Sequence, residues 1–258
     1  PRLTSGNQFG MDQKTIEKLV ENRQEYPFLK IRGIHYFSGT QKRSVSKIQK
    51  ELEKLDVFLG ELKEKYRFEP EELEYGPGLP VSYFDPSKEI GEEGLMEIVR
   101  TVEQMHFSGK ITFEMGRAFA ADCGYYLTKI MDVKSSDDKN YCITDGGIHH
   151  LNYDGQIRGM YEPPMEILAK ERQGEEKNWT ICGSLCTVND IMVQKLAITE
   201  PKPGDILVFK RTGAYSSMEG MLLFLSHSLP KILLYNKEEG FRQIRKAYQT
   251  YKWNMEEK

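Results

Sequence analysis

"LKIRGIHYF", residues 29–37, is rich in residues that favour β-strands, and the pattern directly after it predicts a long amphipathic helix. That helix is indicated by apolar residues that recur with a spacing of three or four: Val45, Ile48, Leu52, Leu55, Leu59, Leu62 and Tyr66. Such a spacing places them all on one helical face. Strand and helix together begin an α/β arrangement.

Two further short segments continue this alternation. "LEYG", residues 73–76, and "KITFEMG", residues 110–116, have the composition of strands, and residues 92–104 between them have a helical pattern. Strands that alternate with helices pair in parallel through right-handed crossovers. We therefore predict a parallel α/β domain over residues 1–122.

The pattern changes after residue 121 to short strand-like runs with turn signals between them. These runs are "GYYLTKIMDV", "NYCITDGG", "WTICG", "GDILVFKRTGAY", "KILLYN" and "FRQIRKAY". Their spacing predicts an antiparallel sheet or barrel over residues 123–258. The polar stretches at residues 134–140 and 170–178 are predicted to be a turn and a solvated loop.

Composition narrows the class of protein. The chain has 258 residues, of which 39% are hydrophobic and 29% are charged, as in a soluble globular protein of one large or two smaller domains. A net charge of -3 without a basic stripe disfavours nucleic acid as a partner. Without a long apolar run or a recognisable leader, we expect no membrane span, no secretion signal and a cytoplasmic location.

The cysteines are too few and too irregularly spaced for a disulfide framework. They are Cys123, Cys142, Cys182 and Cys186. Although Cys182 and Cys186 lie close in sequence, no second close pair completes a zinc site, so we predict no metal. Free thiols in a reducing compartment are expected.

Glycine-rich turns follow four of the predicted strands. The turns lie in "GIHYFSGTQ" (33–41), "EYGPGLPVSYF" (74–84), "FEMGRAF" (113–119) and "GAY" (213–215). Ligands of parallel α/β units bind at the carboxyl ends of strands, and exposed amides together with an arginine suit a phosphate. Any one of these turns alone is more often only a turn.

Taken in order, the motifs are more specific. The series "GIHYFSGTQ", "YGPG", "FEMGR", "TDGGIHH", "CGSLCTVND" and "GDILVFKRTGAY" resembles the pyridoxal-phosphate decarboxylases of the diaminopimelate and ornithine type, over roughly residues 1–235. The resemblance implies part of a TIM-like (β/α)8 barrel followed by a C-terminal antiparallel β domain. It also implies pyridoxal 5'-phosphate as cofactor, an amino acid as substrate, and a homodimer with shared active sites.

The resemblance gives Glu114 the role of the acid that faces the pyridine nitrogen of the cofactor. A carboxylate there keeps the nitrogen protonated and the ring a strong electron sink, which favours decarboxylation. Alanine racemases of similar shape place an arginine at this nitrogen, so a racemase is disfavoured. The alternative for Glu114 is a paired surface acid.

Other cofactor contacts follow from the same resemblance. The phosphate is expected to contact five residues: Thr40, Gly78, Gly116, Arg117 and Tyr215. His35 and Phe37 are expected at the cofactor, with Phe37 in the register of a histidine that commonly stacks on the ring in the family; an aromatic ring can still stack. Pro77 interrupts the usual three-glycine turn and removes one possible amide donor.

Cys186 matches the family cysteine that is offered across the dimer interface and assists protonation after carbon dioxide leaves. The alternative is a small buried hydrophobic residue. Asp145 is expected to hold its turn, whereas His149 and His150 are expected to line the pocket or lie on its rim.

Thr187 bears on the substrate. Diaminopimelate and ornithine enzymes normally have an acid after the cysteine that pairs with the far ammonium group of the substrate, and a threonine supplies no such charge. Arg158 and Tyr161 loosely match the substrate-binding arginine and tyrosine of the diaminopimelate enzymes, and an arginine would suit a carboxylate or carbonyl. Arg158 as a simple surface charge is equally open.

One family feature has no counterpart here. The lysine that forms the Schiff base lies on an early barrel strand, upstream of the segment matching "SGNQFGMD" (5–12), and only about three barrel strands are predicted. We expect a C-terminal portion whose upstream half lies in the same or a separate chain. The predicted function is α-decarboxylation of an amino acid; the alternative is a non-catalytic homologue that acts as a binding or regulatory protein.

Overall fold

The structure, a computed structural model, describes residues 8–256 of the chain. Residues 1–7, at the start of the predicted α/β domain, and 257–258 lie outside the described part. Contacts divide the chain into two compact units, Pro1–Ala118 and Phe119–Lys258. The domain boundary expected from the sequence, 122/123, falls a few residues later.

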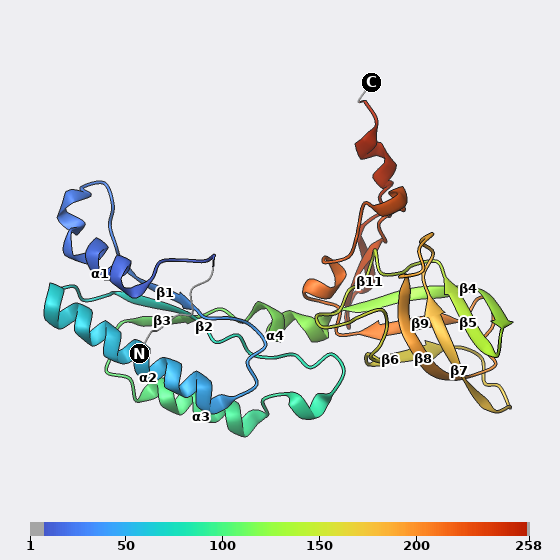
Figure 1. The fold of residues 1–258 in the computed structure, drawn as a ribbon, viewed down its shortest axis with the longest axis horizontal. Coiled ribbons are helices and arrows are strands. Elements are labelled where there is room, and N and C mark those ends of the chain that lie inside the picture. The colour runs from blue at the N-terminus through green and yellow to red at the C-terminus, as the bar shows by residue number, and fades with distance from the viewer. Residues whose placement is uncertain (1–7, 257–258) are drawn as a thin grey trace. The chain divides into compact units, whose positions relative to one another are not determined.

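The first unit alternates helices and strands, as predicted. Its elements are α1 (Gln13–Glu21), β1 (Gly33–Phe37), α2 (Val45–Tyr66), β2 (Glu72–Gly76), α3 (Glu92–Glu103) and β3 (Lys110–Phe113). The three strands pair in parallel in the order β1-β2-β3, and α2 and α3 lie along one face of the sheet (Figure 1). A short α4 (Gly116–Ala120) follows β3.

The predicted apolar stripe of α2 forms the core of this unit. The Ser44 hydroxyl accepts a hydrogen bond from the Lys47 amide and caps the start of the helix. The residue that follows the helix, Arg67, adopts the left-handed conformation. The buried stripe and strand residues against it are Ile48, Leu52, Leu55, Leu59, Leu62, Leu73 and Tyr75. Sequence periodicity therefore identified the residues that hold α2 on the sheet.

The sheet of the first unit is open at both sides. Among residues 8–256, β1 and β3 each pair with β2 and with no other strand. These residues therefore form three parallel strands of α/β type and do not form a closed barrel.

The second unit is built mainly from β-strands. The strands are β4 (Tyr125–Ser136), β5 (Lys139–Thr144), β6 (Met165–Leu168), β7 (Glu176–Cys182), β8 (Ile191–Thr199), β9 (Ile206–Lys210), β10 (Ile232–Asn236) and β11 (Gly240–Arg245). Six of them form a sheet in the order β6-β9-β4-β5-β7-β8, and β10 and β11 form a separate hairpin (Figure 1). Short 3-10 helices occur in both units. Those of the first unit are Arg23–Glu25 and Pro86–Lys88, and those of the second are Ala121–Cys123, Tyr215–Ser217, Phe224–Ser226 and Thr250–Asn254.

Strand β4 bends the larger sheet. Its first part pairs with β9 and its second part with β5, with an irregularity between Ile130 and Asp132. All pairs of this sheet are antiparallel except β5 and β7, which run parallel. The prediction of a purely antiparallel domain is wrong for that pair, because strand direction depends on how the connecting chain crosses the sheet and not on local composition.

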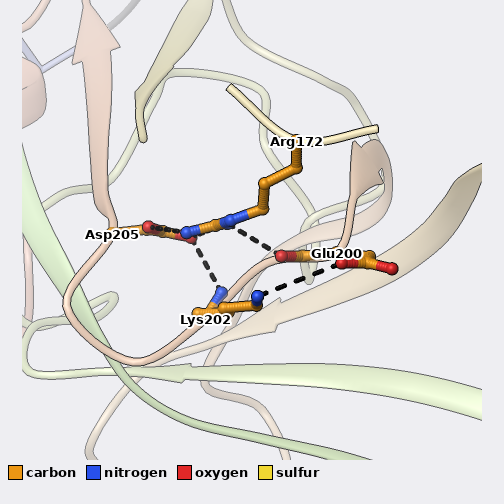
Figure 2. A network of polar contacts seen from close by, with 4 residues as sticks. All are labelled: Arg172, Glu200, Lys202 and Asp205. Atoms are coloured by element: carbon orange, nitrogen blue, oxygen red, sulfur yellow. Dashed lines mark hydrogen bonds and ion pairs between the residues drawn. The ribbon is translucent and has the colours of Figure 1, made fainter. Parts of the chain in front are cut away.

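The stretch at residues 170–178, predicted to be a solvated loop, contains Arg172, which forms a buried ion pair with Asp205 (Figure 2). The Arg172 guanidinium donates two hydrogen bonds to the Asp205 carboxylate, at 2.6 and 2.7 Å. It also donates to the Glu200 carbonyl at 2.8 Å, while the Lys202 amide donates to Asp205 at 2.8 Å. The arginine holds the pKa of the Asp205 carboxyl below its usual range. This network ties the loop to the turn before β9.

Within residues 8–256, no helix is both long enough and apolar enough to cross a membrane.

Candidate functional site

The carboxyl ends of β1, β2 and β3 lie at one edge of the parallel sheet, and the loops that follow β1 and β2 lock together there. Gly78 has a φ of +62°, and a Cβ on it would lie 2.1 Å from the Gly39 carbonyl oxygen. The Lys42 amide also donates to the Gly78 carbonyl at 2.9 Å. Only glycine allows this approach of the two loops.

A second contact between these loops was not foreseen from the sequence. Gln41, at a φ of 57°, accepts a hydrogen bond from the Val81 amide at 2.8 Å and donates to the Val81 carbonyl at 3.2 Å. Thr40, the predicted phosphate contact, is exposed immediately before it. The side chain of Gln41 thus acts like a strand partner and fixes the backbone around Thr40.

Glu114 lies directly after β3 and pairs with His35 of β1. The Glu114 Oε2 atom is 2.8 Å from His35 Nε2, and the two side chains are 47% and 55% exposed. The Glu114 amide donates to the Tyr75 carbonyl at 3.0 Å, which extends the β2–β3 pairing to the acid. The carboxylate is therefore held at the sheet edge, within reach of solvent.

Phe37, the last residue of β1, is also at this edge. Its ring packs against Gly76, where a Cβ would lie 2.8 Å from the ring atom Cδ2. The side chain is 42% exposed, so one part of the ring contacts the strand end and another part is accessible. That position is compatible with a stacking role for the ring.

Arg117 contacts the loop after β2 through Tyr83, a residue that the motifs did not single out. The guanidinium donates to the Tyr83 hydroxyl at 2.9 Å and lies 5.8 Å from the centre of its ring. Gly116 differs from Gly78, since a Cβ there would meet nothing within 4 Å. Packing among residues 8–256 therefore does not require a glycine at 116.

Glu51 of α2 supports the first loop from the side of the helix. It accepts hydrogen bonds from Ser38 and Lys42, both at 2.6 Å, and from the Tyr75 hydroxyl at 3.1 Å. Burial, together with the negative charge of Glu51, raises the pKa of Tyr36 to about 12. This half-buried network fixes the base of the loop that carries Gly39 and Thr40.

In the second unit, Cys186 is exposed in the loop between β7 and β8. The alternative of a small buried hydrophobic residue is therefore wrong. The Thr187 hydroxyl accepts from the Asn189 amide at 3.3 Å. Asp190 closes the loop, and its carboxylate accepts hydrogen bonds from backbone amides.

Arg158 reaches the same loop from the chain between β5 and β6. Its guanidinium donates to the Val188 carbonyl at 3.5 Å, and it lines a cavity of about 160 Å³ together with Asn189. Tyr161 is 46% exposed and is held by its backbone, which exchanges two hydrogen bonds with the Gln156 side chain. The structure therefore brings Arg158 to the loop of Cys186 and Thr187.

The two histidines after β5 are buried and do not lie on a rim. His150 bridges the Tyr126 hydroxyl at 3.1 Å and the Ser228 carbonyl at 2.8 Å. His149 is 0% exposed, and neither ring nitrogen has a hydrogen-bond partner among residues 8–256. Burial, reinforced by the nearby His150 and His227, lowers the pKa of His149 to about 3.

Asp145 and Tyr215 complete the set of residues considered from the sequence. Asp145 accepts from the Thr128 hydroxyl at 2.7 Å and the Lys129 amide at 2.8 Å, so it holds its turn as predicted. Tyr215 begins a 3-10 helix and is 49% exposed. Tyr215 and its glycine turn belong to the same unit as Cys186, whereas Glu114 and the other three glycine turns begin in the first unit.

Comparison with known proteins gives these features a context. Residues 12–213 match the model of the family described as "Pyridoxal-dependent decarboxylase, C-terminal sheet domain". The chain is 29% identical over 255 residues to the L-glutamyl-[BtrI acyl-carrier protein] decarboxylase of Niallia circulans, with 93% of this chain and 58% of that protein covered. It is 26% identical to the 2-[(L-alanin-3-ylcarbamoyl)methyl]-2-hydroxybutanedioate decarboxylase of Staphylococcus aureus, with 88% and 58% covered.

Solved structures show the same fold. The diaminopimelate decarboxylase of Helicobacter pylori complexed with L-lysine superposes with a TM-score of 0.80 at 20% identity, over 97% of this chain and 60% of that one. The diaminopimelate decarboxylase of M. jannaschii in complex with L-lysine gives 0.79 at 24% identity, over 94% and 56%. The chain thus spans less than two thirds of the length of these relatives.

The residues at the sheet edge fit the cofactor of this family. Pyridoxal phosphate combines a phosphate with a pyridine ring, and Gly78 and Gly39 approach so closely that a Cβ on Gly78 would overlap the Gly39 backbone. Arg117 follows the third strand end, and Glu114 is a carboxylate of the kind that binds a protonated ring nitrogen. The matched residues 12–213 include all of these positions, and the chain belongs to the pyridoxal-dependent decarboxylase family.

Proposed function

We propose that the protein takes part in the pyridoxal-phosphate-dependent α-decarboxylation of an amino acid whose far end carries no ammonium group. The observation that carries this proposal is the convergence of three strand ends, where the Gly39–Gly78 approach, Arg117 and Glu114 lie at one edge of a parallel sheet. When bound, pyridoxal phosphate supplies an electron sink for the bonding pair that the departing carboxylate leaves behind.

In this proposal Glu114 holds a proton on the pyridine nitrogen, because a carboxylate favours the charged form of that nitrogen. His35, at 2.8 Å, orients the carboxylate. Phe37 supplies an aromatic face for the ring. The phosphate is assigned to the predicted set of Thr40, Gly78, Gly116, Arg117 and Tyr215.

Cys186 is assigned the delivery of a proton to the carbon that has lost its carboxylate. Its exposure supports this role, since a thiol must be accessible to exchange a proton with a substrate. The resemblance further suggests that the thiol acts across a homodimer with shared active sites.

The substrate class follows from the loop of Cys186. Thr187 offers no negative charge for a distal ammonium group of the substrate. Arg158, which contacts the same loop, suits a carboxylate or carbonyl. Tyr161 is assigned to the substrate together with Arg158. The names of two relatives point the same way: one specifies a glutamyl group on an acyl-carrier protein, the other an alanin-3-ylcarbamoyl group on a hydroxybutanedioate. We infer an acidic or acylated amino acid as substrate.

The remaining barrel strands are assigned to an upstream half, in the same or a separate chain. Two observations support this: β1 and β3 lack an outer partner among the described residues, and relatives are covered to about three fifths of their length. The upstream half would also supply the lysine that holds the cofactor.

The test uses this chain together with its upstream half. Pyridoxal phosphate binding is followed by absorbance, and carbon dioxide release is measured with acidic, acylated and basic amino acids. We expect release from acidic or acylated substrates and poorer release from diaminopimelate and ornithine. Cofactor binding without any release would support the non-catalytic alternative, and equal turnover of diaminopimelate would contradict the inference from Thr187.

A matched pair of variants sharpens the test of the substrate class. Thr187→Glu restores an acid after the cysteine and should shift preference toward diaminopimelate by about tenfold. Val188→Glu places the same charge on the next residue, whose side chain is 82% exposed, and should leave the preference as it is. An equal shift in both variants would mean that general electrostatics, and not position 187, selects the substrate.

A further inference from the structure

Asp190 is a buried carboxylate that joins two separate segments of the second unit. It is 3% exposed and follows the loop of Cys186. Its Oδ1 atom accepts a hydrogen bond from the Ile148 amide at 2.9 Å, and its Oδ2 atom accepts one from the Leu185 amide at 2.8 Å. Each carboxylate oxygen thus binds an amide of a different segment, and the Leu185 amide lies directly before Cys186.

Two glycines leave room for this carboxylate. A Cβ on Gly183 would lie 2.2 Å from the carboxylate of Asp190, and a Cβ on Gly147 would lie 2.6 Å from it. The Gly183 amide donates to the Asp190 carbonyl at 3.0 Å, and the Ser184 amide donates to the Gly146 carbonyl at 2.7 Å. Gly147 of "TDGGIHH" and Gly183 of "CGSLCTVND" are therefore required by the space that the carboxylate occupies.

The geometry requires an acceptor at both oxygens. An asparagine has nearly the same shape, but its amide group would place N–H hydrogens against one of the two backbone N–H donors. A buried donor would then lose its partner, which is much more unfavourable than losing an exposed hydrogen bond.

We propose that Asp190 is a positioning residue, which fixes the backbone before Cys186 against the turn after β5 and so holds the thiol in place for proton delivery. The inference rests on the proposed function of Cys186. In this role Asp190 acts on the position of Cys186 through the Ile148 and Leu185 amides and does not contact the substrate.

The experiment compares Asp190→Asn with Asp205→Asn in this chain with its upstream half. Asp205 is the matched control, because its buried carboxylate also ties a loop of the second unit but does so through Arg172, away from Cys186. Gly183→Ala is a second variant, which displaces the carboxylate while leaving Asp190 unchanged. Hydrogen exchange of the Leu185 and Ile148 amides is measured, together with kcat and KM.

We expect exchange at Leu185 and Ile148 to become about tenfold faster or more in Asp190→Asn and Gly183→Ala, and to stay within twofold of the parent protein in Asp205→Asn. Both test variants should also lower kcat about tenfold because the thiol is displaced, and KM should rise by a smaller factor because Thr187 and the Val188 carbonyl that Arg158 contacts lie on the same loop.

Exchange within twofold of the parent protein in Asp190→Asn would overturn the inference, as would faster exchange with an unchanged kcat. An equal effect of Asp205→Asn would reduce Asp190 to a general stabilising residue and would also overturn it. If the parent protein releases no carbon dioxide, the proposed function fails on that result, whereas the exchange measurements still decide whether Asp190 holds the loop.

Discussion

His149 is one of two buried histidines, with His150, whose lowered pKa values make the stability of the second unit depend on acid pH. Its pKa is lowered to about 3 in the folded chain, first by burial and then by His150 and His227, against about 6.5 for an unfolded histidine. Below pH 6.5 the unfolded state therefore binds a proton that the folded state does not. Stability should fall by about 1.4 kcal/mol per pH unit from this group as pH drops from about 6.5 toward 3.

His149→Leu tests this prediction, because leucine fills the site without a titratable group. Between pH 6 and 4, the free energy of unfolding of the variant should fall less steeply with pH, by the contribution of one bound proton. At pH 7 the variant should be at least as stable as the parent protein, since two buried nitrogens without a hydrogen-bond partner among residues 8–256 are removed. Urea unfolding at several pH values, followed by tryptophan fluorescence, measures it, because Trp179 and Trp253 both lie in the second unit. His106→Gln, in the first unit, is the control; an unchanged slope in His149→Leu would contradict the prediction.

At single positions, the sequence identified residues that belong to a motif and missed residues defined by distant partners. Glu114 and Cys186 were singled out because glycines and hydroxyls surround them in a recognisable order, and their roles stay predictions. Tyr83 and Asp190 were not assigned roles, because their partners are far along the chain: Tyr83 contacts Arg117, and Asp190 contacts Ile148. Local composition carries no signal for such pairs.

The loops after β1 and β2 pack directly against each other at Gly78. Because of the positive φ and the approach to the Gly39 carbonyl, Gly78→Ala should lower the free energy of unfolding of the first unit by about 2 kcal/mol or more. Gly60 of α2, where a Cβ would meet no atom of the described residues within 4 Å, gives the control. Gly60→Ala should raise stability by about 0.5–1 kcal/mol, because alanine favours a helix over glycine.

The measurement is urea unfolding followed by helical circular dichroism, since the long helices belong to the first unit. If Gly78→Ala unfolds at the same urea concentration as the parent chain, the loops do not depend on the absence of a Cβ, and the proposed phosphate cradle loses its main structural support.

Elements were predicted well where a period fixes them. The helix α2 matches its apolar stripe, and the three strands of the first unit lie within or close to the predicted segments and pair in parallel as predicted. The parallel pairing of β5 with β7 was not predictable, because short strands with turn signals look alike whichever way they run. The strand β3 ends at Phe113, so Glu114 and Met115 lie in the connection to α4 and Gly116 begins that helix, whereas the sequence predicted a strand up to residue 116.

For the whole molecule, the open sheet predicts self-association when the proposed upstream half is absent. Within the described residues β1 and β3 expose unpaired backbone edges, which favour pairing with other chains. We expect the chain alone to form larger species at higher concentration and the chain with its upstream half to form them less. Light scattering after size exclusion measures the difference, and equal behaviour of both samples would contradict the prediction.

A charged edge tests the same idea within the chain. Thr112→Lys places a lysine on the exposed edge strand β3, next to Glu74 in the register of the sheet, and should reduce self-association of the chain alone. Val57→Lys adds the same charge on an exposed position of α2 and should have little effect. A similar reduction by both variants would indicate that net charge, and not the strand edge, controls association.

The parallel pairing of β5 with β7 has a consequence for how such proteins diverge. To run parallel, the chain must cross from Thr144 to Glu176 over the sheet, and this crossover contains Asp145, His150 and Arg158. This connection contains β6, which pairs with β9, and Arg172, which is bonded to Asp205, so insertions are compatible with the sheet only in the stretches between these anchors. The stretch between β5 and β6 carries Arg158, so under the proposed role of this arginine an exchange of that stretch between relatives should alter substrate preference.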